Sequence, residues 1–176
     1  MNNNQSKSNY STTIKQFKSY LDEEDFQYIR KAFENNYIAE GEISKEFHDR
    51  LLSIIGAKYG CFASNGTLAL YLALKALGVK AGDEVLVQDI TFIASANAVE
   101  MVGATPIFVD IIKYNNLTID LSKIKLKNNT KAIVICHLFG TACENIKEVK
   151  TYCIKNKLFL IEDAAQALAI KSVNGH

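Results

Sequence analysis

The sequence predicts an α/β fold, an open, doubly wound and mostly parallel sheet preceded by N-terminal helices. Two observations support this. Short, unbroken apolar runs alternate with helical patterns along the chain, which is typical of α/β proteins. The runs also lack polar–apolar alternation, which is typical of parallel strands buried on both faces. The expected strands are residues 61–63, 85–87, 107–109, 132–136 and 158–161.

Helical patterns fill most of the remaining chain. Apolar residues at helical spacing predict helices over residues 14–35, 43–55, 67–77, 92–102 and 144–156. We expect the first to be interrupted near Asp22, and the second to begin at the candidate cap Ser44 and end at Gly56. The helix over 67–77 is apolar on almost every face, with Lys75 as its only charge, which predicts a buried helix. Residues 112–129 are polar, and we expect them to be irregular.

The predicted organisation has three parts. Residues 1–13 are rich in Asn and Ser and predict a disordered tail. Residues 14–40 form a helical arm, and residues 41–176 form the main domain. A chain of 176 residues suffices for one compact domain but hardly for two.

Composition excludes several classes of protein. The apolar content of 48% is typical of a globular chain and excludes a mainly disordered one. The net charge of +1 provides no basic excess for nucleic acid. No apolar run is long enough to cross a membrane, and the N-terminus lacks the apolar stretch of a secretory signal. The four cysteines match no zinc spacing, so we predict no metal site, and free buried thiols in a cytoplasmic protein.

The candidate site follows from the fold. In open α/β sheets, ligands bind outside the carboxyl ends of the strands. The residues that follow the predicted strands are 64–67, 88–92, Asp110, 137–140 and 163–166.

Ser64-Asn65-Gly66-Thr67 joins a strand to a helix. The unpaired N–H groups at a helix start bind phosphate well, and Gly66 allows close approach while Thr67 adds a hydroxyl. The alternative is plain capping by Ser64 or Asn65.

Three further side chains have two interpretations each. Asp163 is suited to pair with a protonated ring nitrogen, or caps a following helix. Phe92 stacks on a flat ring, or is an ordinary core aromatic. His137 acts as a general base or, as is more common for a lone histidine, has a structural role.

Several ordered stretches resemble one family. They are Glu40-Gly41 with Glu46-Phe47, Ser64 to Leu70, Gly82 to Val85, Thr91-Phe92, Gly103 to Asp110, His137 to Gly140, and Ile161 to Ala167. Together they resemble the large domain of the DegT/DnrJ/EryC1/StrS aminotransferases, which are fold-type I enzymes that use pyridoxal 5′-phosphate (PLP). The resemblance covers about three-quarters of the chain, far more than a lone glycine motif.

The resemblance implies a role for each cofactor-binding residue. Gly66 and Thr67 would hold the PLP phosphate, with Leu68 adding a neighbouring backbone N–H. Phe92 would stack on the pyridine ring. Asp163 would pair with the ring nitrogen and keep it protonated. Gln166 would contact the hydroxyl group of the ring.

The implied reaction is transfer of an amino group, with glutamate as the expected donor, to a keto carbon of a nucleotide-linked sugar. Products of this kind serve surface polysaccharide or lipopolysaccharide synthesis, and such enzymes are homodimers. Two alternatives within the family stay open: a non-catalytic or split-gene relative that binds PLP, a sugar nucleotide or a partner chain, and a PLP-dependent sugar dehydratase. Another enzyme class on a doubly wound sheet is disfavoured, because the chain has no G-x-G or G-K-[ST] motif.

The sequence departs from the family in two places. The lysine that forms the Schiff base is expected beyond His176, and Lys171 lacks the required context, so no catalytic residue is assigned within the chain. Gln88-Asp89 stands where the family has proline. The resemblance also implies that strands following the lysine insert beside residues 61–63. Without them this strand would lack neighbours.

Overall fold

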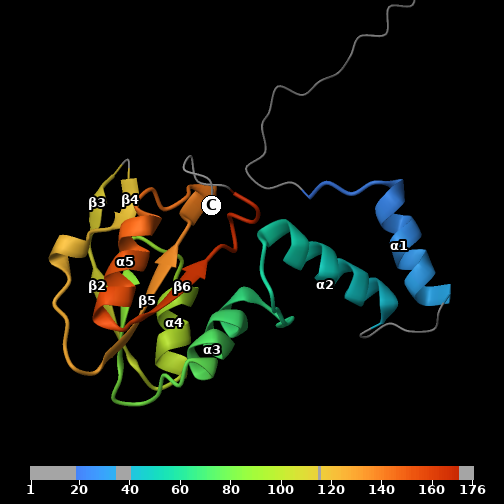
Figure 1. Ribbon diagram of the computed structural model, residues 1–176. Coiled ribbons are helices and arrows are strands. Elements are labelled where there is room, and N and C mark those ends of the chain that lie inside the picture. Colours follow the sequence, from blue (N-terminus) through green and yellow to red (C-terminus); the bar gives the residue numbers. More distant parts are fainter. Residues whose placement is uncertain (1–18, 35–40, 115, 171–176) are drawn as a thin grey trace, which may run out of the picture. The chain divides into compact units, whose positions relative to one another are not determined.

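The computed structural model describes residues 19–34, 41–114 and 116–170 (Figure 1). The chain divides into two compact units, residues 1–49 and 50–176. The predicted tail over 1–13 lies outside the described residues, as do parts of the predicted arm. The predicted domain boundary at residue 41 stays a prediction.

The first unit contains helix α1 (Glu23–Glu34). The carboxylate of Asp22 accepts the backbone N–H of Glu24 at 2.9 Å, which caps the helix start. This explains why the helical pattern is interrupted at Asp22. Phe26, Ile29 and Phe33 form the expected apolar stripe, and all three are exposed.

Helix α2 (Glu42–Ile55) crosses the division between the units. It starts two residues before Ser44, so the predicted cap is wrong and Ser44 lies inside the helix. Gly56 ends the helix as predicted, with a φ of +67° that an L side chain rarely adopts.

The second unit has the predicted α/β architecture. Its sheet order is β2-β1-β5-β6, and every pair in it is parallel. The strands are β1 (Glu84–Gln88), β2 (Thr105–Val109), β5 (Thr130–Cys136) and β6 (Phe159–Asp163). The helices are α3 (Gly66–Ala76), α4 (Ala94–Met101) and α5 (Ile146–Asn156). The doubly wound parallel fold is therefore confirmed.

Helices pack on both faces of this sheet (Figure 1). Val85 and Val87 of β1 pack in one cluster with Leu74 of α3 and residues of α4. Leu86, which lies between them, packs in a second cluster with Val149 of α5. Successive side chains of a strand point to opposite faces, so an unbroken apolar run supplies both cores.

Two local predictions about the second unit are wrong. Residues 61–63 form no strand, since none of the described strands pairs with them and an isolated strand leaves its backbone groups without a ladder. Helix α3 is also less buried than its composition predicts. Only Leu70 and Leu74 are buried, and Leu72 is 45% exposed, because a single face of the helix packs on the sheet.

Residues 112–129 are more ordered than predicted. Strands β3 (Ile111–Lys113) and β4 (Asn116–Ile119) pair as an antiparallel hairpin, and a 3-10 turn, η1 (Leu121–Lys123), follows. Ile119 is fully buried in the cluster beneath α5, which anchors this polar segment. Among the residues that the structure describes, no helix is both long and apolar enough to span a membrane.

Candidate functional site

A pocket of about 220 Å³ brings together five of the six predicted cofactor-binding residues. It lies where α3 begins, β5 and β6 end, and the loop before α4 passes. Its lining consists of Gly66, Thr67, Phe92, Ala94, Cys136, Asp163, Ala165 and Gln166. Leu68 is the predicted residue outside this lining. These residues come from four segments. Three of them follow β1, β5 and β6 and meet because parallel strands end at the same edge of the sheet, and the start of α3 lies beside them.

The start of α3 combines capping with free donors. Asn65 caps the helix, since its side-chain oxygen accepts the backbone N–H of Leu68 at 3.0 Å. The N–H of Leu68 is therefore already engaged. Within the described residues, the N–H groups of Gly66 and Thr67 make no hydrogen bond. A Cβ at Gly66 would meet no atom within 4 Å. The pocket thus has two unpaired donors and open space at the positive end of a helix, which suits an anion.

Asp163 contributes a buried carboxylate. Its side chain accepts the backbone N–H of Ala165 at 3.1 Å on Oδ1 and the hydroxyl of Ser95 at 3.2 Å on Oδ2. Asp163 is 8% exposed, and no Lys, Arg or His of the described ranges forms an ion pair with it. No helix follows in residues 164–170, so the capping alternative fails. A buried carboxylate without a cation favours a ligand that carries a positive N–H group.

Phe92 presents an aromatic ring to the pocket. It lies in the loop before α4, which begins two residues later than predicted, and the backbone N–H of Ser95 donates to its carbonyl at 3.1 Å. Phe92 is 58% exposed, so it is not an ordinary core aromatic. An aromatic face on a pocket wall is suited to stack on a flat ring.

Gln166 is held by the loop after β5. Its side-chain oxygen accepts the backbone N–H of Phe139 at 2.7 Å, which leaves the amide nitrogen as the free polar group. Phe139 adopts a left-handed conformation with a φ of 56°, and a Cβ on Gly140 would approach the carbonyl of Gln166 to 3.2 Å. This loop therefore fixes Gln166 with its donor available to an acceptor on a ligand.

His137 has the structural role. Its Nδ1 accepts the backbone N–H of Cys143 at 3.0 Å, and its Nε2 lies 3.1 Å from the carboxylate of Glu162. Because Nδ1 accepts, the neutral ring carries its proton on Nε2 and donates it to Glu162. This hydrogen bond lowers the pKa of Glu162, and Lys150 lies 3.7 Å from the same carboxylate. Both ring nitrogens are engaged outside the pocket lining, so the general-base interpretation is not supported.

The cysteines differ in exposure. Cys136, Cys143 and Cys153 are buried, whereas Cys61 is exposed, contrary to the predicted burial of all four. Burial raises the pKa of Cys153 to about 11 and also raises that of Cys136. Cys136 lines the pocket, and sequence analysis missed it. The signal was present, because Cys136 is the last residue of β5 and so lies at the edge where ligands bind.

Gln88, which with Asp89 stands where a proline was expected, connects two walls of the site. Its side-chain amide donates to the carbonyls of Ile90 at 2.8 Å and Cys136 at 3.4 Å. These bonds tie the loop before α4 to the end of β5, which a proline could not do. The other amide atom, Oε1, is buried and has no partner within the described part of the chain.

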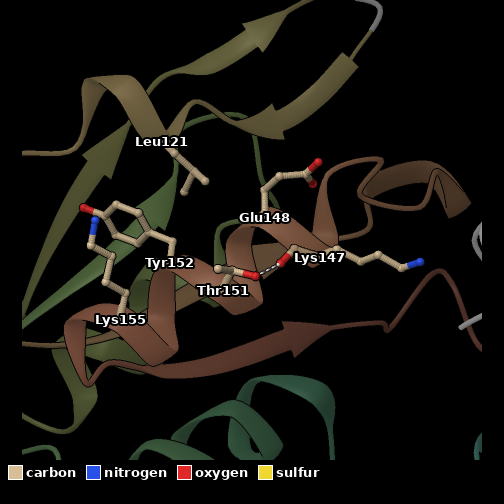
Figure 2. A pocket seen from close by; sticks show the side chains of 6 residues that line it. All are labelled: Leu121, Lys147, Glu148, Thr151, Tyr152 and Lys155. Carbon is tan, nitrogen blue, oxygen red and sulfur yellow. Dashed lines mark hydrogen bonds between the residues drawn. The ribbon is translucent and has the colours of Figure 1, made fainter.

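A second and larger hollow, of about 470 Å³, lies beside α5 and η1 (Figure 2). Its charged side chains do not converge, since Lys147 and Lys155 point in opposite directions in Figure 2. The hydroxyl of Thr151 is already bonded to the carbonyl of Lys147 at 2.8 Å. Ligand sites need convergent polar groups, so the pocket at the strand ends is the better candidate.

Comparison with known proteins identifies the family of the chain. Residues 19–176 match the DegT/DnrJ/EryC1/StrS aminotransferase family. The chain is 38% identical over 150 residues to GDP-perosamine synthase of Escherichia coli O157:H7, covering 82% of this chain and 40% of that protein. It is also 38% identical over 159 residues to dTDP-3-amino-3,6-dideoxy-alpha-D-galactopyranose transaminase of Aneurinibacillus thermoaerophilus, covering 88% of this chain and 42% of that protein.

A solved structure is similar as well. The structure of NtdA from Bacillus subtilis, which has the cofactor PMP bound, superposes with a TM-score of 0.78 at 28% identity and covers 85% of this chain and 34% of that one. The chain thus spans less than half the length of these proteins. It belongs to the DegT/DnrJ/EryC1/StrS aminotransferase family.

Proposed function

We propose that the whole protein uses PLP to transfer an amino group from glutamate to a keto carbon of a nucleotide-linked sugar. The product would serve the synthesis of a surface polysaccharide or lipopolysaccharide. The two curated relatives described above, named for amino sugars linked to GDP and dTDP, support the substrate class. The observation that carries the proposal is the buried carboxylate of Asp163, which has no cationic partner among the described residues and lies in a pocket with the N–H groups of a helix start and an exposed aromatic ring.

The pocket offers a partner to each of four groups of PLP, which are the phosphate, the flat ring, the ring nitrogen and the ring hydroxyl. The unpaired N–H groups of Gly66 and Thr67 suit a phosphate, and the absent side chain at Gly66 leaves room for it. Phe92 offers its ring to a flat pyridine. Asp163 offers a carboxylate to a ring N–H, and a neighbouring opposite charge favours the protonated form of the nitrogen. Gln166 offers an amide donor, because its oxygen is already bonded to Phe139.

The role of Leu68 is more limited. The backbone N–H of Leu68 donates to the side-chain oxygen of Asn65, which caps the helix. We therefore propose that Leu68 supports the helix start, and that its N–H contacts the phosphate only if this cap rearranges. When bound, PLP supplies an electron sink for the carbanion formed on the substrate carbon. The residues of this chain bind and orient the ring and keep its nitrogen protonated. We propose that the lysine of the reaction lies beyond His176.

Binding is tested first, with the 176-residue chain and pyridoxamine 5′-phosphate (PMP). PMP needs no lysine for its attachment. Titration by calorimetry should show one site, and Asp163→Asn should weaken binding at least about 10-fold, because an amide cannot pair with a ring cation as a carboxylate does. The control is Glu162→Gln, which removes a neighbouring carboxylate outside the pocket lining and should leave affinity unchanged. Equal affinity in wild type and Asp163→Asn would contradict the assigned site.

Activity and the lysine are tested on the whole protein. With PLP, L-glutamate and a GDP- or dTDP-linked keto-sugar, mass spectrometry should detect 2-oxoglutarate and the amino sugar together. Borohydride reduction and peptide mapping should place the pyridoxyl label on a lysine after residue 176. A stoichiometric label on a lysine within residues 1–176 would overturn that placement. Conversion of the sugar without 2-oxoglutarate would favour the dehydratase alternative.

We further propose that the whole protein is a cytoplasmic homodimer. Apolar side chains on loops near the pocket support a second subunit that would cover them, since Phe92, Ile93 and Phe139 are 58%, 66% and 77% exposed. Free cysteines, three of them buried, support a reducing compartment. Sedimentation equilibrium of the whole protein tests the dimer, and a monomer at micromolar concentration would refute it.

A further inference from the structure

Behind the pocket, two hydroxyls link the loop before α4 to the carboxylate at the end of β6. The Oγ of Ser95 lies 3.2 Å from Oδ2 of Asp163, and the hydroxyl of Thr91 lies 3.1 Å from Oγ of Ser95. Ser95 is 1% exposed, so no solvent competes for its hydroxyl. Ser95 does not line the pocket, yet it contacts a residue that does.

The direction of each hydrogen bond follows from the number of protons. An ionised carboxylate only accepts, so Ser95 must donate its single hydroxyl proton to Asp163. The oxygen of Ser95 must then accept in its contact with Thr91, which makes Thr91 the donor. The two hydroxyls therefore donate in series toward Asp163, and each such bond strengthens the next.

The arrangement also fixes the orientation of the carboxylate. The backbone N–H of Ala165 holds Oδ1 at 3.1 Å, and Ser95 holds Oδ2. With one donor on each oxygen, rotation about the bond to the carboxylate carbon would break both bonds. The backbone N–H of Ser95 also donates to the carbonyl of Phe92 at 3.1 Å. One residue thus connects the carboxylate to the aromatic wall.

We propose that Ser95 is a positioning residue, supported by Thr91, which holds the carboxylate of Asp163 in place for the protonated ring nitrogen of a pyridine cofactor. This inference rests on the proposed function for the identity of the ligand. Ser95 touches neither the cofactor nor the substrate and acts through Asp163. Removal of its hydroxyl leaves the carboxylate with the single Ala165 bond and free to turn away from the ring.

The test uses PMP labelled with ¹⁵N in its ring, bound to the 176-residue chain at pH 8. Nitrogen NMR distinguishes a protonated from a neutral ring, and a structural role alone would not change that signal. Wild type should show the protonated ring. Ser95→Ala should bind PMP about 10-fold more weakly, in line with the loss of a hydrogen bond to a charged group, and should show a larger neutral fraction. Ser95→Thr, which keeps the hydroxyl, should restore the protonated signal.

A double-mutant cycle tests whether Thr91 acts on Asp163 through Ser95 or independently of it. Thr91→Val should shift the signal in the same direction as Ser95→Ala but less, and should add nothing in the Ser95→Ala background, because Thr91 acts through Ser95. Thr151→Ala is the matched control: it removes a helix hydroxyl that, among the described residues, bonds only to the carbonyl of Lys147 in the same helix, and should change neither affinity nor signal.

The outcomes separate the two proposals. If wild type binds PMP with a protonated ring and Ser95→Ala, folded by circular dichroism, gives the same affinity and signal, the role of Ser95 is refuted while the cofactor site stands. If wild type does not bind PMP, the proposed cofactor site fails, and the role of Ser95 fails with it. Additive effects of the Thr91 and Ser95 variants would refute the series of donors.

Discussion

The two glycines at the ends of α3 should respond in opposite ways to substitution by alanine. Gly66 begins the helix, does not have a positive φ, and a Cβ there would meet no atom within 4 Å. Gly66→Ala therefore introduces no clash and no strain. Alanine is favoured over glycine in helix interiors by about 1 kcal/mol, which sets an upper limit on the gain at this first position. Folding stability should stay unchanged or rise.

The same methyl group should weaken binding. It would project into the space beside the free N–H groups, where the proposed phosphate lies. Loss of one hydrogen bond to a charged group costs about 1.5–3 kcal/mol, which corresponds to about 10- to 150-fold in affinity for PMP. Gly66→Ala should thus be stable but deficient in binding.

Gly78 provides the matched control. It follows the same helix with a φ of +76°, and a Cβ there also meets no atom within 4 Å. Gly78→Ala should lose about 1–2 kcal/mol, the cost of a left-handed conformation for an L residue, while PMP affinity stays unchanged. Urea unfolding followed by circular dichroism gives the stabilities, and calorimetry gives the affinities. If Gly66→Ala lost stability and retained its affinity for PMP, the assignment of the helix start as the phosphate site would be wrong.

Three other predictions concern the core, the hydrogen bond between His137 and Glu162, and a thiol. Ile133 is fully buried in β5, so Ile133→Ala should cost about 2–5 kcal/mol in urea unfolding, whereas Ile154→Ala, at an 80% exposed position, should stay within about 0.5 kcal/mol. The hydrogen bond from His137 lowers the pKa of Glu162 in the folded chain. The ionised carboxylate therefore stabilises the fold at pH values above its unfolded-state pKa of about 4.3, and this stabilisation is lost as the pH falls through the folded-state pKa. The stability difference between wild type and Glu162→Gln should therefore shrink as the pH is lowered below about 4, and a difference that grows in acid would contradict this. Cys61 should react with a thiol reagent before the three buried cysteines, and equal rates for all four in the folded chain would refute the assigned burial.

Local pattern was sufficient to predict most of the second unit. An unbroken run such as Val85-Leu86-Val87 predicts a strand buried on both faces, and its side chains do supply two clusters. The prediction of secondary structure failed where the pairing of one strand with another decides whether a strand forms. Residues 61–63 have the composition of a strand, but none of the strands that the structure describes pairs with them. The polar segment around Ile119 becomes a hairpin because one fully buried side chain anchors it.

The site was predicted in outline by the rule that ligands bind at strand ends. That rule selected Gly66, Phe92, Asp163 and Gln166, which do line one pocket. It also selected His137, whose ring is engaged with Glu162 and the backbone of Cys143 instead. Sequence position indicates which edge of the sheet a residue occupies, but it does not indicate which neighbours its side chain meets.

The sequence by itself determined the alternation of strands and helices, the parallel sheet and the family, because apolar periodicity and ordered motifs are local properties of the chain. Only the tertiary structure decided that Ser95 donates to Asp163, 68 residues away, and that Phe139 fixes the amide of Gln166. Such contacts depend on sheet order and on loop conformation. These place atoms within hydrogen-bonding distance only after distant segments have packed together.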